Sequence, residues 1–223
     1  MKNLAIIPAR GGSKRIPHKN IKKFLGKPII AYSIEAAIKS RLFDEVMVST
    51  DDNEIADVAK QYGAKVPFMR SNKNADNFAS ISDVIKEVKT EYLNVSKKFD
   101  NICCILATAP LIKIESLKKT FSILQNKGVD SVRPIVRFSY PIQRAFKLTN
   151  MKVEMFSPQY MNTRSQELEP AFHDAGQFYW MKYAPGLEGP GRYGLEIPEL
   201  GVQDIDTEED WKLAEMKYNL IKG

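Results

Sequence analysis

The chain has 223 residues, and its 33 Lys and Arg against 27 Asp and Glu leave a formal net charge of +6 and a sequence pI near 9.1. With 43% hydrophobic and 27% charged residues, it has the composition of an ordinary globular domain that is long enough to bury one sizeable core. These proportions exclude a miniature scaffold, a disordered chain and a collagen-like repeat.

The predicted elements alternate between apolar strands and amphipathic helices from the start of the chain. A buried strand at residues 4–7 precedes a helix that Pro28 opens, because proline fits the first turn of a helix. A second strand at 46–49 leads into a helix that Gly63 closes with a left-handed cap. A short third strand is expected at 66–68.

The second half of the chain continues this alternation and then loses it. Ser80 can cap a helix, residues 102–106 predict the central strand, and the next helix is expected to end by Gly128. The regular pattern lasts through residues 131–136. Residues from about 138 to 194 then hold many aromatics, prolines and glycines with little helical period, which predicts an irregular excursion. Regularity returns in one last helix.

The repeated strand-helix-strand order predicts an α/β fold in which helices cover both faces of a mostly parallel sheet. We therefore expect a three-layer, Rossmann-like arrangement with right-handed crossovers, formed by a single domain of residues 1–223. Ligands of such sheets bind at the carboxyl ends of the strands. The loops that follow the strands are thus the places to search for a site.

Several classes of protein and site are excluded by residue counts. The longest nearly apolar stretch, residues 102–112, is far shorter than the roughly 20 residues of a membrane helix, and the N-terminus lacks the apolar region of a signal peptide. We expect a protein that neither spans a membrane nor is secreted. Cys103 and Cys104 should point to opposite faces of one strand rather than pair. With only two histidines, no zinc site of familiar spacing can be assembled.

The most informative segment is the loop directly after the first strand, residues 8–20. Its Gly11 and Gly12 let the backbone approach a ligand and turn N–H groups inward. Four cationic side chains accompany them: Arg10, Lys14, Arg15 and Lys19. Because guanidinium and ammonium groups suit the oxygens of several phosphates, the loop predicts a polyphosphate site. It matches neither the Walker pattern nor the G-x-G-x-x-G turn, and the competing interpretation is a basic surface loop.

A second polar group lies near the C-terminus. In an extended segment Asp204 and Asp206 project to the same side, so both carboxylates can face one hard cation. Mg²⁺ usually takes one or two carboxylates together with substrate phosphates, so the pair indicates metal-assisted phosphoryl chemistry. The competing interpretation is that these acidic residues serve the N-terminal end of the last helix, which Thr207 caps. We assign residues 208–210 to the helix cap and the two aspartates to the metal.

Four motifs are distributed over nearly the whole chain. They are I-P-A-R-G-G-S-K-R-I-P-H-K-N at 7–20, S-T-D-D at 49–52, T-A-P-L at 108–111 and D-I-D-T at 204–207. In this order they resemble the motifs of acylneuraminate cytidylyltransferases, and the first is the most specific. Residues 107–110 and 174–180 look most like the pseudaminic acid branch of that family. Leu106 stands where the sialic acid enzymes usually carry a glutamine, which weakens a sialic acid assignment.

The resemblance implies a nucleotidyltransferase fold and a magnesium-dependent transfer of CMP from CTP to the anomeric hydroxyl of a nonulosonic acid, releasing pyrophosphate. It also implies a cytoplasmic enzyme of cell-surface or flagellar glycan synthesis. By analogy Arg10 and Lys14 are catalytic and hold the phosphates. Asp206 is catalytic as a metal ligand beside Asp204. The implied CTP-binding residues are Ala9, Arg10, Gly11, Gly12, Ser13, Lys14, Lys19, Asn20, Asn77 and Ser80.

The resemblance further implies residues that bind the sugar acid. Arg164 and Gln166 align with the acceptor-binding segment of the family, and an arginine can hold a carboxylate through two parallel hydrogen bonds. Asp174 and Gln177 are candidates for reading hydroxyl or amide groups. The competing interpretation of these residues is a well-packed strand entry with solvated polar neighbours.

A homodimer is expected on two grounds. The excursion has too little regular structure to bury its own apolar side chains, and the family's excursion reaches over a partner subunit.

Alternatives stay open in two directions. The acceptor alternatives are sialic, legionaminic and eight-carbon acids, the last disfavoured because its enzymes usually have a shorter, glycine-poor first loop. A nucleotide- or nucleic-acid-binding protein would explain the positive charge without catalysis. Nucleic-acid binders show clustered cations among exposed aromatics, whereas the informative cations here gather in one loop. We therefore expect CTP and a nonulosonic acid as partners, Mg²⁺ as cofactor, and no nucleic-acid or membrane partner.

Overall fold

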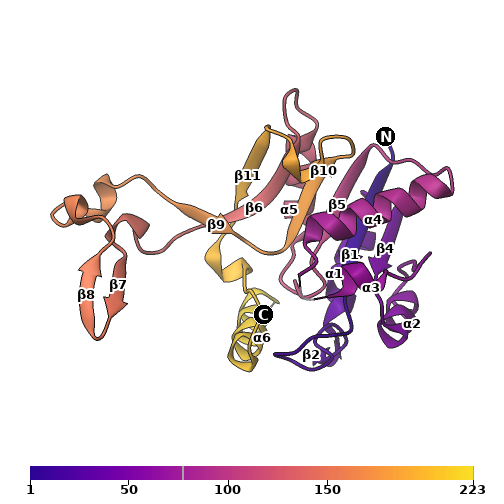
Figure 1. The fold of residues 1–223 in the computed structure, drawn as a ribbon, viewed down its shortest axis with the longest axis horizontal. Coiled ribbons are helices and arrows are strands. Elements are labelled where there is room, and N and C mark those ends of the chain that lie inside the picture. The colour runs from indigo at the N-terminus through magenta and orange to yellow at the C-terminus, as the bar shows by residue number, and fades with distance from the viewer. Residues whose placement is uncertain (77, 223) are drawn as a thin grey trace.

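A seven-stranded sheet forms the centre of the part of the chain that this computed structural model describes, residues 1–76 and 78–222 (Figure 1). Its strands are β1 (Asn3–Pro8), β4 (Glu45–Ser49), β5 (Asn101–Ile105), β6 (Ser131–Arg137), β9 (Phe172–Asp174), β10 (Phe178–Lys182) and β11 (Arg192–Glu196). They lie in the order β11-β6-β10-β5-β1-β4, with β9 also paired to β6. Only β9 and β10 run antiparallel to their neighbours in this sheet. The expected mostly parallel sheet is confirmed.

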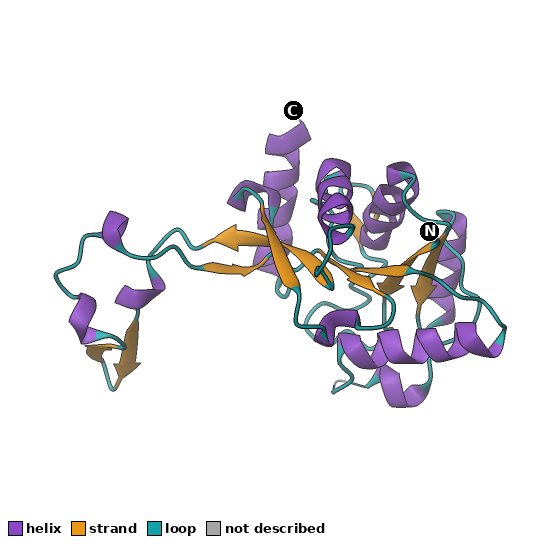
Figure 2. Cartoon of the chain, turned by 90° about the horizontal axis from the view of Figure 1, so that it is seen from above, coloured by secondary structure: helices purple, strands orange, loops and turns teal. Residues whose placement is uncertain are grey.

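Helices cover both faces of the sheet, as the view in Figure 2 shows. The α-helices are α1 (Ile29–Ser40), α2 (Asn53–Gln61), α3 (Asn72–Ala75), α4 (Ile81–Asn94), α5 (Ile114–Leu124) and α6 (Glu208–Lys222). One core cluster packs α1, α2 and α5 against one face, and another packs α4 against the opposite face. Among the described residues, no helix is both long and apolar enough to cross a membrane.

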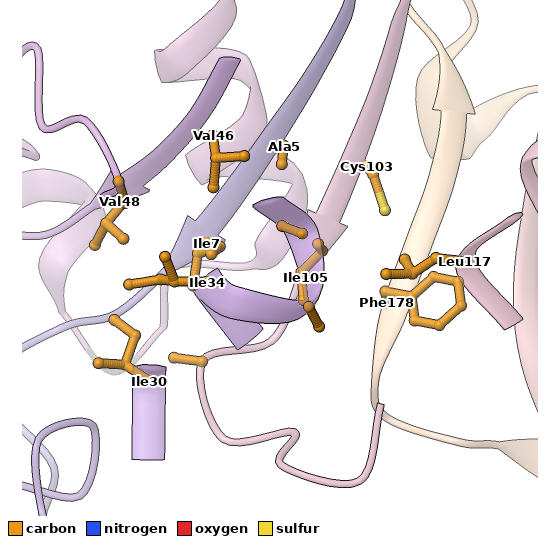
Figure 3. Packing of buried hydrophobic residues seen from close by; sticks show 14 of the residues in the cluster. Ala5, Ile7, Ile30, Ile34, Val46, Val48, Cys103, Ile105, Leu117 and Phe178 are labelled. Atoms are coloured by element: carbon orange, nitrogen blue, oxygen red, sulfur yellow. The ribbon is translucent and has the colours of Figure 1, made fainter. Parts of the chain in front are cut away.

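Side chains on the central strands alternate between these two clusters. Ile7 and Cys103 belong to the first cluster, where Leu117 of α5 reaches the same face of the sheet (Figure 3). Ile6 and Cys104 belong to the second cluster. Both cysteines are free and buried, and they lie on opposite faces as the strand periodicity predicts.

Most helix boundaries follow the predicted caps. α1 begins directly after Pro28, α2 ends just before Gly63 with its φ of +90°, and Ser80 caps α4 with its hydroxyl. α5 ends earlier than expected, and Gly128 (φ +82°) lies in the turn that follows. The remaining short elements of the body are β2 (Lys23–Phe24), β3 (Lys27–Pro28), η4 (Gly186–Glu188) and η5 (Glu199–Gly201).

The strand expected at residues 66–68 is wrong. Only the preceding residue, Lys65, forms an isolated bridge to β4. Pro67 has no N–H to donate, so it cannot extend a ladder of hydrogen bonds. The segment instead runs along the end of β4, where the Arg70 N–H donates to Thr50 O (2.8 Å). This path brings a guanidinium to the carboxyl edge of the sheet.

Residues 138–171 leave the end of β6 as an arm that projects away from the body before the chain returns at β9 (Figure 1). The arm contains η1 (Ile142–Arg144), β7 (Phe146–Thr149), β8 (Lys152–Met155), η2 (Pro158–Tyr160) and η3 (Ser165–Glu167). The excursion is therefore shorter than the expected 138–194, because the later residues return to the sheet as β9, β10 and β11. No α-helix separates these strands in the described chain, so the helical period that marks a crossover is missing.

Candidate active site

The carboxyl ends of β1 and β5 border a cavity of about 520 Å³, here called the switch-point cavity. It lies where the chain order reverses, since β4 follows β1 on one side and β5 adjoins β1 on the other. Its walls come from the loop after β1, the segment around 70–84 and the loop after β5. The predicted CTP-binding residues that line it are Arg10, Ser13, Lys14, Lys19, Asn20 and Ser80.

Hydrogen bonds between side chains and the backbone hold the loop after β1 in shape. The buried Asn20 donates from Nδ2 to Arg10 O (2.9 Å), and the Gly11 N–H donates to Asp51 Oδ1 (3.0 Å). Ala9 is buried, and its N–H extends the β1–β4 ladder rather than facing the cavity. Gly12 is exposed, and a Cβ there would meet no atom within 4 Å. The predicted loop therefore divides into residues that shape it and side chains that face the cavity.

Two of the cationic side chains of this loop donate to backbone carbonyls of distant segments. Arg10 donates from Nη1 to Asp76 O (2.7 Å), and the exposed Lys14 lines the cavity. Lys19 donates to Ile205 O (2.7 Å), which ties the loop to the aspartate segment near the C-terminus. The first and last motifs of the chain are thus brought together in space.

The two predicted metal ligands lie beside these cations. Asp206 pairs with Arg15 (2.9 Å) and Lys19 (3.5 Å). Partial desolvation and the neighbouring Asp206 charge raise the pKa of Asp204. A hard cation bound by both carboxylates would offset their like charge. No cluster of three or more His, Cys, Asp or Glu side chains in the described residues is arranged for a metal, so any further ligands would have to come from elsewhere, such as substrate oxygens.

The helix cap and the aspartate pair are separate features. Asp210 Oδ2 accepts from the Thr207 N–H (2.8 Å) and the Asp206 N–H (3.1 Å), and its own N–H donates to Thr207 Oγ1 (3.2 Å). This reciprocal cap accounts for Asp210 at the start of α6. It leaves the side chain of Asp206 to the cations of the loop after β1.

Ser80 lines the switch-point cavity from the start of α4. Its hydroxyl accepts from the Asp83 N–H (3.2 Å) and its own N–H donates to Asp83 Oδ2 (2.9 Å), which forms the capping box of α4; the hydroxyl also donates to Asp83 Oδ2 (2.6 Å). Ser80 therefore lines the cavity while its hydroxyl serves the helix. Asn77, the neighbouring predicted residue, lies outside the described residues.

A second cavity of about 510 Å³ adjoins the first, since Leu106 lines both. Asp204 also lines it, together with Asp174 and Tyr179. Asp174 is held by three donors, which are Arg133 Nη1 (3.0 Å), the Gly176 N–H (2.8 Å) and the Tyr179 hydroxyl (3.2 Å). Burial and the Asp174 carboxylate raise the pKa of Tyr179, which keeps this hydroxyl protonated as a donor.

Three of the predicted sugar-binding residues do not join this cavity within the described chain. Gln177 is only 3% exposed, and its Nε2 donates to Gly201 O (2.7 Å), so it fastens the strand entry instead of facing either cavity. Arg164 and Gln166 lie on the arm, and Gln166 lines a separate cavity at the arm's base. Figure 1 shows the arm standing well apart from the loop after β1.

Arg70 is a cavity residue that sequence reasoning missed. It is 7% exposed and lines the switch-point cavity, where its Nε donates to Ser49 Oγ (3.0 Å) and its Nη2 donates to Ser49 O. Burial lowers its pKa below the usual value for arginine. The sequence signal for Arg70 was a single cation directly after an apolar run. That signal was overlooked because the run was predicted, wrongly, to be a strand at 66–68. Arg133 and Tyr179 were missed because only the folded sheet brings them to Asp174.

Comparisons with known proteins agree with this geometry. A family model described as cytidylyltransferase matches residues 4–187. The chain is 44% identical over 227 residues to a pseudaminic acid cytidylyltransferase of Campylobacter jejuni subsp. jejuni serotype O:2, covering 99% of this chain and 97% of that protein. It is 34% identical to a CMP-N,N'-diacetyllegionaminic acid synthase of Legionella pneumophila subsp. pneumophila, with the same coverage.

A solved structure shares the fold across the full length. A CMP-2-keto-3-deoxy-manno-octonic acid synthetase complexed with CTP superposes with a TM-score of 0.71 at 19% identity, covering 100% of this chain and 99% of that one. The architecture is thus the Rossmann-like nucleotidyltransferase fold that the motifs imply.

Proposed function

The chain belongs to the cytidylyltransferase family, and from this premise we propose that it transfers CMP from CTP to the anomeric hydroxyl of a nonulosonic acid and releases pyrophosphate. The observation that carries the proposal is the loop after β1, which presents Arg10, Lys14 and Lys19 to the cavity at the switch point. Pseudaminic acid is the acceptor best supported, because the relatives named for it are more similar than those named for legionaminic acid.

The charges around the switch-point cavity suit a triphosphate. In the reaction the acceptor oxygen attacks the α-phosphorus in line, and the bond from that phosphorus to the pyrophosphate oxygen breaks. Negative charge then develops on the departing pyrophosphate, and cations fixed in advance stabilise it without reorganising. We assign this role to Arg10 and Lys14 from the loop, with Lys19 and the buried Arg70 neutralising the nucleotide around them.

Mg²⁺ is part of the proposal, held by Asp204 and Asp206. Carboxylate oxygens are ligands that Mg²⁺ prefers, and the contacts of Lys19 with Ile205 O and Asp206 bring the loop after β1 to this segment, which supports the placement. When bound, Mg²⁺ would neutralise phosphate charge and help orient the nucleotide. Arg15 and Lys19, which pair with Asp206, keep the two segments of the site together.

The acceptor is proposed to occupy the second cavity. Leu106 separates it from the nucleotide side, which supports an arrangement in which the attacking hydroxyl and the α-phosphorus meet beside this residue. Asp174 keeps acceptor capacity for a hydroxyl or amide N–H of the sugar on Oδ2, which accepts from Arg133, whereas the Gly176 N–H and the Tyr179 hydroxyl both donate to Oδ1.

We further propose a homodimer that works in the cytoplasm, where CTP is available. The arm exposes apolar side chains such as Phe146, Leu148 and Phe156, and a second copy would cover them. Arg164 and Gln166 lie on the arm, away from the cavities of their own chain. In the dimer they would complete the acceptor site of the partner subunit.

Pyrophosphate release tests the proposal directly. The assay offers CTP, UTP or ATP in turn with pseudaminic, legionaminic and sialic acid, and we expect turnover with CTP and the highest kcat/KM for pseudaminic acid. A preference for sialic acid would overturn the acceptor while leaving cytidylyl transfer intact. Equal turnover with UTP would overturn the base assignment, and tight binding of a single-stranded oligonucleotide without turnover would favour a nucleic-acid binder.

A further inference from the structure

The last residue of β4 and the turn that follows it, residues 50–52, accept hydrogen bonds from the main chain of the loop after β1. The Gly11 N–H donates to Asp51 Oδ1 (3.0 Å), and the Ala9 N–H donates to the last carbonyl of β4 (2.9 Å). These bonds lie on either side of Arg10, whose side chain faces the switch-point cavity. The backbone of the loop is thus fixed at both neighbours of a cation of the site.

The turn after β4 and the loop after β1 pack closely against each other at Gly11. A Cβ at Gly11 would lie 2.6 Å from Asp52 Oδ2 and 2.9 Å from Asp52 Cβ, which is closer than side chains pack. The next glycine, Gly12, faces open space. Gly11 is therefore required by contact with the turn after β4, whereas no such contact constrains Gly12.

The same turn also accepts a hydrogen bond from the main chain of Arg70, the buried arginine of the cavity. The Arg70 N–H donates to Thr50 O (2.8 Å). Burial lowers the pKa of Arg70, and the negative charge of Asp51 opposes that shift. Asp51 itself is absent from the described residues that line the cavity. One carboxylate outside the cavity thus binds the loop and adds a negative charge that favours the charged guanidinium inside it.

We propose that Asp51 is a positioning residue, which holds Gly11 through its N–H so that the cations of the loop are preset for the triphosphate. The inference rests on the proposed function and adds a residue that orders the binding groups without touching substrate. A loop with two adjacent glycines has much conformational freedom to lose. Fixing it before the nucleotide arrives removes that cost from binding.

The test is calorimetric titration with CTP in excess magnesium and without acceptor. Asp51→Ala is expected to raise the CTP dissociation constant roughly 10- to 100-fold, the scale of one hydrogen bond to a charged group. The matched control is Asp57→Ala, which removes an exposed carboxylate from neighbouring α2 and should change the constant by less than about twofold. An Asp51→Ala protein that binds CTP like the wild type would overturn the proposal.

Asp51→Asn separates the hydrogen bond from the charge, because the amide oxygen can still accept from the Gly11 N–H. We expect it to recover CTP affinity to within about fivefold of the wild type, and kcat/KM with it. An Asn variant as weak as the Ala variant would overturn the positioning role in favour of a purely electrostatic one.

Gly11→Ala disturbs the contact between the loop and the turn from the side of the loop. It provides a test if Asp51→Ala fails to fold. Its Cβ must displace the loop from Asp52, so CTP affinity should fall, and unchanged affinity would overturn the proposal. Titration of the wild-type protein distinguishes a failure of the proposed function from a failure of the role of Asp51. A wild-type protein that does not bind CTP would overturn the proposed function itself, whereas normal wild-type binding with unaffected variants would overturn only the role of Asp51.

Discussion

Arg10 and Lys14 reach the switch-point cavity from the loop after β1, and neither side chain belongs to the buried apolar core. Replacing either by alanine should lower kcat/KM by roughly 10²–10³, because one lost contact to transition-state charge typically costs about 3–4 kcal/mol. Steady-state kinetics with CTP and the acceptor measure this, and thermal unfolding should be nearly unchanged. Lys23→Ala, an exposed lysine on β2, is the matched control. A loss of kcat/KM below about tenfold at both positions would indicate that the loop is only a basic surface.

Asp206 and Asp210 are neighbours with different tasks. Asp206→Asn should raise the magnesium concentration needed for half-maximal rate by at least roughly tenfold, because a charged ligand is lost. Asp210→Asn weakens the cap of α6 and should lower the melting temperature while leaving the magnesium titration unchanged. The two variants are compared by measuring activity as a function of magnesium concentration and by a thermal unfolding scan. An unaltered titration for Asp206→Asn would remove that residue from the metal site.

At the scale of elements, Glu45 at the start of β4 joins the sheet to α4. Its side chain is 3% exposed and accepts from Tyr92 of α4, from Lys97 and from Lys65 (2.9 Å). Glu45→Ala leaves the buried Tyr92 hydroxyl without this acceptor, which should cost about 1–3 kcal/mol of unfolding free energy. Glu35→Ala also removes a glutamate held by two lysines, but at 28% exposure it should cost below about 1 kcal/mol. Urea denaturation compares them, and equal losses would contradict the argument.

The same network predicts a pH dependence. Although burial alone would raise the pKa of Glu45, the hydrogen bonds from Lys97, Tyr92 and Lys65 bring it below the usual value. A lowered folded-state pKa means that the stabilisation is present above the unfolded pKa of about 4.3 and is lost as the pH falls through the folded value. The stability gap between wild type and Glu45→Gln should therefore shrink below about pH 4. A gap that stays constant between neutral and acid pH would contradict it.

The elements differ in how well local sequence predicts them. β1, β4, β5 and their helices follow from apolar runs that alternate with helical spacing, because each buries a regular face. β10 was predicted as part of an irregular excursion, since its run F-Y-W-M-K is short and no helix connects it to β9. The loop after β1 was predictable because its glycines and cations are contiguous. Arg70 and the Arg133–Asp174 pair depend on contacts between distant segments, which no local pattern encodes.

At the scale of the whole molecule, the arm makes a dimer testable by complementation. If Arg164 acts in the partner subunit, a mixed dimer of Arg164→Ala and Lys14→Ala chains contains one intact site. Random mixing of two inactive proteins should then restore about a quarter of wild-type activity, since half of the dimers are mixed and each has one working site. Light scattering should report a dimer for each parent protein. No recovery after subunit exchange would place Arg164 within its own chain.

The position of β10 has a consequence for how the chain reaches this fold. β10 fills the gap between β5 and β6, although the chain makes it only after both of them and after the whole arm. Contacts this distant in sequence close slowly, because the entropy of the intervening loop opposes them. Trp180, fully buried and stacked on Phe43 (ring centroids 4.9 Å apart), enters the sheet in that step. Because β10 is synthesised after β5 and β6, we expect it to insert between them late in folding, and the burial of Trp180 should then report completion of the sheet.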